Sequence, residues 1–208
     1  MQHTREVCYS CYRPQTSCMC EYIKPMETKT RFVLLMHPKE FRKTKNGTGH
    51  LTHNSLPNSE MYVGIDFTKH KEVQAIINDE QNECFMLYPH EKALKLNHEK
   101  IKTQKNLVIF IVDSTWPCSR KILRVNPKLQ AMKKISFENE SSSKFYIKTQ
   151  PNLYCLSTIE STLFVIRLLN NQGIETITNR SFEEFLQPFE KMVEYQLECA
   201  KEEAIRYK

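Results

Sequence analysis

An apolar run of six residues that ends abruptly at an acid constrains the fold of this chain more than any other feature. Leu107–Val112 is rich in β-branched residues, and Asp113-Ser-Thr-Trp116 follows it directly. Pro117 then suits the first turn of a helix. A buried strand that stops at a polar turn before a helix is where α/β proteins place their ligands. We therefore expect Asp113 to face a crevice at the carboxyl end of a strand; the alternative is that Asp113 or Ser114 only caps the helix.

Two further apolar runs, Arg31–Met36 and Glu83–Tyr88, also have the length and composition of buried strands. Residues Tyr62–Asp66 predict a short strand that contains Gly64, and a glycine inside a strand often marks a bulge. The runs alternate with helical patterns, which predicts an α/β fold with a mostly parallel sheet. With 208 residues, the chain can bury one sizeable core and carry at most a small appendage.

Two helices are expected in the last third of the chain. Residues 157–160 read Ser-Thr-Ile-Glu, a capping box that predicts a helix from Thr158. Ser181–Glu184 repeats the capping pattern and predicts the start of a last amphipathic stretch that runs to about residue 207. Pro188 is expected to kink or split that stretch, because proline lacks the N–H that a helix interior needs.

Four of the eight cysteines fall within residues 8–20, as Cys8, Cys11, Cys18 and Cys20. Four thiolates so close together can surround a zinc ion, which would supply the folding energy that so short a segment lacks. An iron–sulfur cluster uses the same ligands, and unbound or redox-active thiols are the remaining alternative. The pattern predicts a zinc-binding element over residues 1–28. Its closed four-cysteine site is not expected to be catalytic.

The net charge of the chain and the absence of several sequence motifs limit the functions that it could have. The formal net charge of +6 suits a polyanionic partner. No apolar run approaches the about 18 residues of a membrane span, and the N-terminus has no apolar signal region, so a cytoplasmic location is the default expectation. Neither a Gly-x-Gly-x-x-Gly fingerprint nor a Walker loop is present, which argues against an ordinary dinucleotide or P-loop site.

A basic segment follows the first strand. It begins at His37 and ends in the glycine turn of residues 46–49. Such a segment predicts a loop or short helix that contacts a polyanion, and a solvated charged face is the alternative. Gly47 and Gly49 suggest close backbone approach or a positive φ. With tRNA as the polyanion, which the family resemblance given next implies, the candidate RNA-binding residues are Arg13, His37, Lys39, Arg42, Lys43 and Lys45.

Four motifs in order give the chain a resemblance to the DTW-domain proteins. The cysteine segment with Arg13-Pro14 resembles the family's opening motif, and His37-Pro38-x-Glu40 with Asn-Gly-Thr-Gly is similar to its second. Asp113-Ser-Thr-Trp116 resembles the Asp-x-Thr-Trp element, and Thr158-Ile-Glu-Ser161 the Thr-Ile-Glu-Ala element. The chain departs from the commoner pattern in the identities of His50, Ser114 and Ser161.

The resemblance implies a tRNA-uridine aminocarboxypropyltransferase. Such enzymes move the 3-amino-3-carboxypropyl group of S-adenosylmethionine to N3 of a uridine in tRNA, and methylthioadenosine leaves. The partner implied is tRNA, with no DNA and no membrane. The family's relation to the SPOUT class implies a SPOUT-like catalytic domain over residues 29–208, with a C-terminal trefoil knot. The alternatives are a SPOUT-type tRNA methyltransferase and a non-catalytic zinc-containing RNA-binding protein.

Within that family pattern Asp113 and Trp116 are the candidate catalytic residues. Asp113 is either the base that takes the uridine N3 proton or a ligand of the donor's amino group or ribose. Trp116 would stack on adenine or on a flipped uracil, and its alternative is a core tryptophan. Arg120 would pair with the methionine carboxylate, and Glu160 could instead only complete its capping box. The candidate S-adenosylmethionine-binding residues are Thr115, Ser119, Arg120, Thr158 and Glu160.

Overall fold

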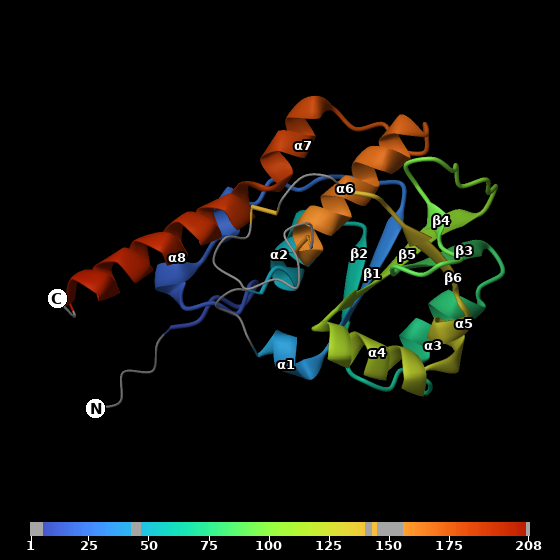
Figure 1. The fold of residues 1–208 in the computed structure, drawn as a ribbon, viewed down its shortest axis with the longest axis horizontal. Helices are drawn as coiled ribbons and strands as arrows, with labels where there is room; N and C mark the ends of the chain where they lie inside the picture. Colours follow the sequence, from blue (N-terminus) through green and yellow to red (C-terminus); the bar gives the residue numbers. More distant parts are fainter. Residues whose placement is uncertain (1–5, 43–46, 140–142, 145–155, 207–208) are drawn as a thin grey trace.

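The computed structural model describes residues 6–42, 47–139, 143–144 and 156–206. These residues form a parallel sheet of six strands in the order β2-β1-β5-β3-β6-β4 (Figure 1). The predicted α/β fold with a mostly parallel sheet is confirmed. The strands are β1 (Arg31–Met36), β2 (Ser59–Val63), β3 (Asn82–Leu87), β4 (Leu94–Lys95), β5 (Asn106–Asp113) and β6 (Lys133–Ser136).

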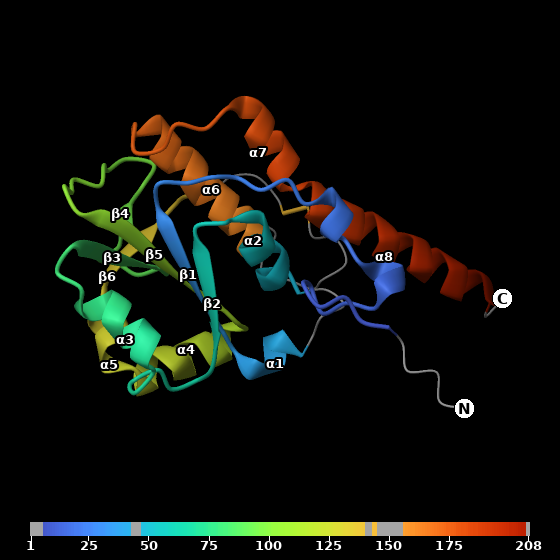
Figure 2. The same ribbon diagram turned by 180° about the vertical axis from the view of Figure 1, so that it is seen from behind.

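The central strands are continuous apolar runs because helices cover both faces of the sheet. Alternate residues of β1 point to opposite sides: Phe32 and Leu34 join one buried cluster, and Val33 and Leu35 join the other. Helices α3, α4 and α5 cover one face, and α2, α6 and α7 cover the other (Figures 1 and 2). The helices are α1 (Pro38–Phe41), α2 (Gly49–Ser55), α3 (Lys71–Asn78), α4 (Trp116–Val125), α5 (Pro127–Ala131), α6 (Thr158–Asn171), α7 (Asn179–Phe185) and α8 (Gln187–Arg206).

The boundaries of three elements test the sequence predictions. Helix α6 begins at Thr158 with the expected capping box. The expected start of the next helix at Ser181 is wrong, because Thr178 caps α7 by accepting a hydrogen bond from the Ser181 N–H at 3.3 Å. The split near Pro188 is confirmed: α8 starts at Gln187, which puts the proline in the first turn, where no N–H is needed.

Gly64 does not lie inside a strand as predicted. Strand β2 runs from Ser59 to Val63 and ends one residue earlier. The Gly64 N–H donates to the Met36 carbonyl at 3.0 Å, so it closes the carboxyl end of the β1–β2 pair. The glycine allows the aromatic ring of Phe67 to lie close, since a Cβ here would stand 3.0 Å from that ring.

The N-terminal segment packs into the main core. It contains short 3-10 helices at Gln15–Ser17 and Cys20–Tyr22. Met19 lies between them and Met26 follows them, and both are buried in the same apolar cluster as Met192 of α8. The Met26 N–H also donates to the Ser55 carbonyl at the end of α2, at 2.9 Å. The segment therefore shares the core of the sheet domain.

The buried side chain of Glu175 holds the backbone just before the start of β1. Both oxygens of Glu175, which is 4% exposed, accept backbone N–H groups, from Lys29 at 2.9 Å and from Thr30 at 2.8 Å. We predict that Glu175→Ala lowers the free energy of unfolding by about 3 kcal/mol in urea titrations, because one buried and one part-buried N–H donor lose a charged acceptor. Glu184→Ala is the control: this acid pairs with exposed Arg180 and should cost less than about 1 kcal/mol. Equal losses in the two variants would contradict the prediction.

The connection from β6 to α6 leaves the expected C-terminal trefoil knot untested. It includes residues 140–142 and 145–155, which lie outside the described residues, so the trefoil knot and the SPOUT class stay predictions. Among the helices that the structure describes, none combines the length and the apolar character of a membrane span.

Candidate active site and metal site

Asp113 lies at the carboxyl edge of the sheet. It is the last residue of β5, half-buried, and pairs in register with Met36 at the end of β1. Its carbonyl accepts the N–H of His37 at 3.1 Å, which holds the two strand ends together. Thr115 is the N-cap of α4, and its side chain makes no capping hydrogen bond. The alternative that Asp113 or Ser114 caps this helix is therefore wrong.

The Asp113 carboxylate is held from two sides. The Thr158 hydroxyl, in the first turn of α6, donates to Asp113 Oδ1 at 2.7 Å. Gly49, the first residue of α2, lies so close that a Cβ would stand 2.1 Å from Asp113 Oδ2 and 2.5 Å from Met36 Cε. The amino end of the long α6 favours negative charge at this point. The site thus joins three family motifs that are far apart in the sequence.

Close backbone approach at Gly49 was one of the two expectations for the glycine turn, and it is confirmed. We predict that Gly49→Ala displaces the Asp113 carboxylate, since no atom can stay 2.1 Å from a new Cβ. If Asp113 belongs to the active site, kcat/KM of this variant for the enzyme's reaction (proposed below) should fall at least about tenfold. This corresponds to about 1.4 kcal/mol of lost transition-state stabilisation.

The control for this change is Gly64→Ala, whose Cβ would come closest to the Phe67 ring, at 3.0 Å, and not to Asp113. Both variants should lower the melting temperature, but only the change at Gly49 should lower kcat/KM. An active Gly49→Ala protein would contradict the assignment of Asp113 to the site.

An aromatic pair borders the acid. Trp116, in the first turn of α4, is 41% exposed, so it is not a core tryptophan. Its ring meets Tyr88 edge-to-face, with centroids 5.9 Å apart and an interplanar angle of 69°. Tyr88 directly follows β3 at the same edge of the sheet. Tyr88 was not among the predicted site residues. The signal that could have indicated it was an aromatic residue at the end of a buried apolar run.

Two of the expected donor-binding residues are hydrogen-bonded within the protein. Ser119 is 4% exposed, and its hydroxyl donates to the Trp116 carbonyl at 2.9 Å. Glu160 is 7% exposed and accepts the Ser157 N–H, the Ser143 hydroxyl and the Lys144 N–H, each at 2.8 Å. Glu160 therefore completes its capping box and also fixes residues 143–144. Thr115 and Arg120 are exposed on α4.

Some of the candidate RNA-binding residues are exposed and others are buried. Lys39 is exposed on α1 and Arg42 is exposed as the C-cap of that helix, which lies near the Asp113 edge of the sheet (Figure 1). His37 is 5% exposed, and its Nδ1 accepts the Lys39 N–H at 3.1 Å as the N-cap of α1. Burial and then the charge of Lys39 lower the pKa of His37, so its imidazole is neutral near pH 7. Lys43 and Lys45 lie outside the described residues.

Arg13 is buried, with 1% of its surface exposed. A phosphate contact requires an exposed guanidinium, so the structure does not support the expected role of Arg13 in gripping RNA. Burial lowers the pKa of Arg13, and the charge of the Cys11 thiolate acts in the opposite direction. Arginine nonetheless stays protonated in proteins. Its partners are protein groups, described below.

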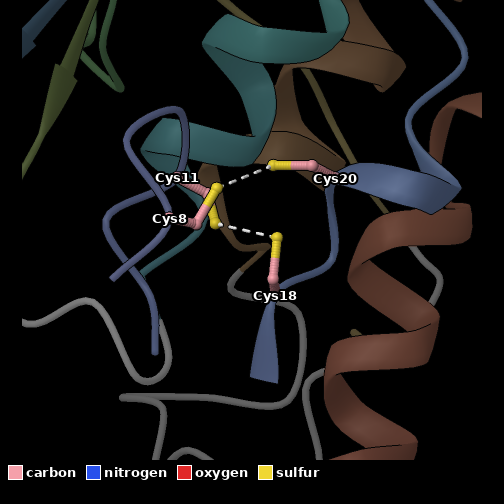
Figure 3. Close-up of side chains that lie close together, drawn as sticks. All are labelled: Cys8, Cys11, Cys18 and Cys20. Atoms are coloured by element: carbon pink, nitrogen blue, oxygen red, sulfur yellow. Dashed lines mark hydrogen bonds between the residues drawn. The ribbon is translucent and has the colours of Figure 1, made fainter. Parts of the chain in front are cut away.

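The four N-terminal thiols face one another (Figure 3). Their Sγ atoms all lie within 4.8 Å of each other, with Cys8–Cys20 and Cys11–Cys18 distances of 3.8 Å. A tetrahedral ion with metal–sulfur bonds of about 2.3 Å requires sulfur–sulfur distances of about 3.8 Å. The Cys11 backbone N–H lowers the pKa of Cys8, whereas burial raises the pKa of Cys18 and of Cys20. A bound metal ion holds such cysteines as thiolates. The cysteines are thus positioned to bind a metal ion.

Comparison with known proteins places the whole chain in one family. The DTW domain matches residues 5–197. The tRNA-uridine aminocarboxypropyltransferase 2 of Macaca fascicularis is 26% identical over 93% of this chain and 64% of its own length. The protein of that name from Drosophila melanogaster is 26% identical over 81% of this chain and 68% of its own.

A more distant relative covers less of the chain. The tRNA-uridine aminocarboxypropyltransferase A of Arabidopsis thaliana is 24% identical over 60% of this chain and 52% of its own length. The chain therefore spans one half to two thirds of the length of these relatives. No solved structure matches the chain. The motifs gathered around Asp113 and the match over residues 5–197 agree: the chain belongs to the DTW domain family.

Proposed function

We propose that this protein transfers the 3-amino-3-carboxypropyl group of S-adenosylmethionine to N3 of a uridine in tRNA and releases methylthioadenosine. The observation that carries the proposal is the environment of Asp113, a half-buried acid held by the Thr158 hydroxyl. The exposed ring of Trp116 lies three residues further along the chain. The relatives named as tRNA-uridine aminocarboxypropyltransferases support the reaction class.

In the proposed step, Asp113 accepts the proton of uridine N3 as the nitrogen attacks the donor. The N3–carbon bond forms at the methylene next to sulfur, the carbon–sulfur bond breaks, and its electron pair leaves with methylthioadenosine. Because the sulfonium is already a good leaving group, placement of the two substrates supplies most of the acceleration. Trp116 offers an aromatic face to the adenine or to a uracil turned out of its stack.

The second possible role of Asp113 is to bind the donor's amino group or ribose. In either role Thr158 orients the carboxylate through its hydrogen bond. Thr115 and Arg120, both exposed on α4, are proposed to contact the donor, Arg120 through its carboxylate. Ser119 and Glu160 are buried and support the donor site indirectly. Ser119 donates to the Trp116 carbonyl, and Glu160 accepts from Ser143 and Ser157.

The proposed RNA surface begins at α1. Lys39 and Arg42 project from it, and Lys43 and Lys45 continue the same basic run along the chain. His37 supports α1 as its cap. We propose zinc as the metal of residues 1–28, residues 29–208 as the catalytic domain, tRNA as the partner, and a cytoplasmic location. A site of four thiolates is closed, so this zinc is structural.

Release of methylthioadenosine tests the proposal. Purified protein with S-adenosylmethionine should form methylthioadenosine, measured by chromatography, only when tRNA is present. Formation of S-adenosylhomocysteine instead would favour a SPOUT-type methyltransferase. Absence of S-adenosylmethionine binding in calorimetry would favour a non-catalytic RNA-binding protein. Both outcomes contradict the proposal.

A further inference from the structure

The guanidinium of Arg13 is buried at the junction of the cysteine segment and the sheet domain. It is 1% exposed, and Nη2 donates to the Gly47 carbonyl at 2.7 Å and contacts Met192 Sδ at 3.1 Å. Nε and Nη1 are buried without a hydrogen-bond partner among the residues that the structure describes. A buried cation with two unused donors is costly unless negative charge lies nearby. The neighbourhood of Arg13 must therefore supply that charge.

The nearby cysteines supply it. The cysteines that act electrostatically on Arg13 are Cys11, Cys20 and Cys18, and each carries a negative charge once it binds a metal as a thiolate. Four thiolates around one divalent ion carry a net charge of about −2, since each cysteine ligand is deprotonated. Arg13 neutralises part of this charge, and its buried Nε and Nη1 are the donors that its described contacts leave over. Groups that surround a metal's ligands in this way set its affinity.

The same segment contacts the backbone that touches Asp113. Arg13 holds the Gly47 carbonyl, two residues before Gly49, and the Asn54 side chain donates to the Ser10 carbonyl at 3.0 Å. The Tyr12 ring, on a residue with a left-handed φ of 58°, packs against His50 with centroids 5.1 Å apart. A non-glycine residue in this region is uncommon and must be held by its surroundings. Residues 10–13 of the cysteine segment (residues 8–20) thus contact the chain at both ends of α2.

From these contacts we propose that Arg13 is a positioning residue that couples metal binding to the active site. Its guanidinium fork joins the metal-bound thiolates to the Gly47 carbonyl and so fixes Gly49 against Asp113. The effect on the donor rests on the proposed function, whereas the effect on the metal does not. A metal-free element therefore leaves residues 47–49 without their anchor.

Two variants of Arg13 separate the effect of its positive charge from the effect of its several hydrogen-bond donors. Arg13→Met keeps an apolar chain of similar length without charge, and it should raise the rate or extent of zinc release to a chelator about tenfold or more. Arg13→Lys keeps the charge and should retain zinc nearly as well as the unaltered protein. A single ammonium does not reproduce the fork, so Arg13→Lys should speed hydrogen exchange at residues 47–52 and raise the Kd for S-adenosylmethionine several-fold.

Arg31→Met is the matched control. It also removes an arginine, but one that pairs with Glu60 at the edge of the sheet, away from the cysteines. It should change neither zinc release nor exchange at residues 47–52. The proposal is overturned if Arg13→Met releases zinc as slowly as Arg31→Met, or if Arg13→Lys leaves exchange and donor affinity unchanged. If no aminocarboxypropyl transfer occurs but zinc release and exchange change as expected, the positioning role stands and only the proposed function fails.

Discussion

Asp113→Asn is expected to lower kcat/KM for aminocarboxypropyl transfer to tRNA by about 10²-fold or more, the usual contribution of a general base. The amide keeps the shape of the side chain and can still accept the Thr158 hydroxyl, but it cannot take the N3 proton. The affinity for tRNA should not change, because the exposed cations of α1 are untouched. Steady-state kinetics and a tRNA binding titration provide the two measurements.

The Kd for S-adenosylmethionine decides between the two roles of Asp113. An unchanged Kd with a lost rate identifies the base, and a Kd raised in step with the loss identifies the donor ligand. Ser114→Ala is the control, since this neighbouring hydroxyl donates only to the Thr115 carbonyl. An Asp113→Asn protein with more than a third of the original kcat/KM would contradict both roles.

Cys11→Ser is expected to have the largest effect on stability. Cys11 is fully buried, and its sulfur faces that of Cys18 at 3.8 Å. Structural zinc contributes about 10–16 kcal/mol to the folding of isolated zinc-finger peptides. Losing even about 5 kcal/mol of that would lower the melting temperature of a chain of this size by about 10 °C or more.

The variant should also copurify without a full equivalent of zinc, as measured by mass spectrometry of the metal. Cys199→Ser is the matched control: this cysteine lies on α8, outside the cluster, and should leave the metal content and melting temperature unchanged. Full zinc occupancy in Cys11→Ser, or equal melting temperatures in the two variants, would contradict a structural metal site.

The strands were predictable because burial on both sides of a parallel sheet leaves a continuous apolar signal. The runs at residues 31–36 and 107–112 became β1 and the core of β5. The ends of helices that begin in polar segments were harder to predict. The start of α7 was misplaced because Thr178 and Ser181 are both good capping residues, and only the tertiary structure selects between them.

The site was predictable where a motif carries the chemistry, and less so where distant elements meet. Asp113, Thr158 and Gly49 were all identified from sequence, but their contact requires three elements to converge. Arg13 was expected to contact RNA phosphates, a role that requires an exposed guanidinium. Its burial depends on Met192, 179 positions away, which no local pattern indicates.

Isotope labelling shows which part of the donor reaches tRNA. The protein is incubated with tRNA and S-adenosylmethionine labelled either in the carboxyl carbon or in the S-methyl group. For the proposed aminocarboxypropyl transfer, we expect carboxyl label in the uridine of tRNA and methyl label only in methylthioadenosine. Methyl label in tRNA, with S-adenosylhomocysteine as the second product, would contradict it.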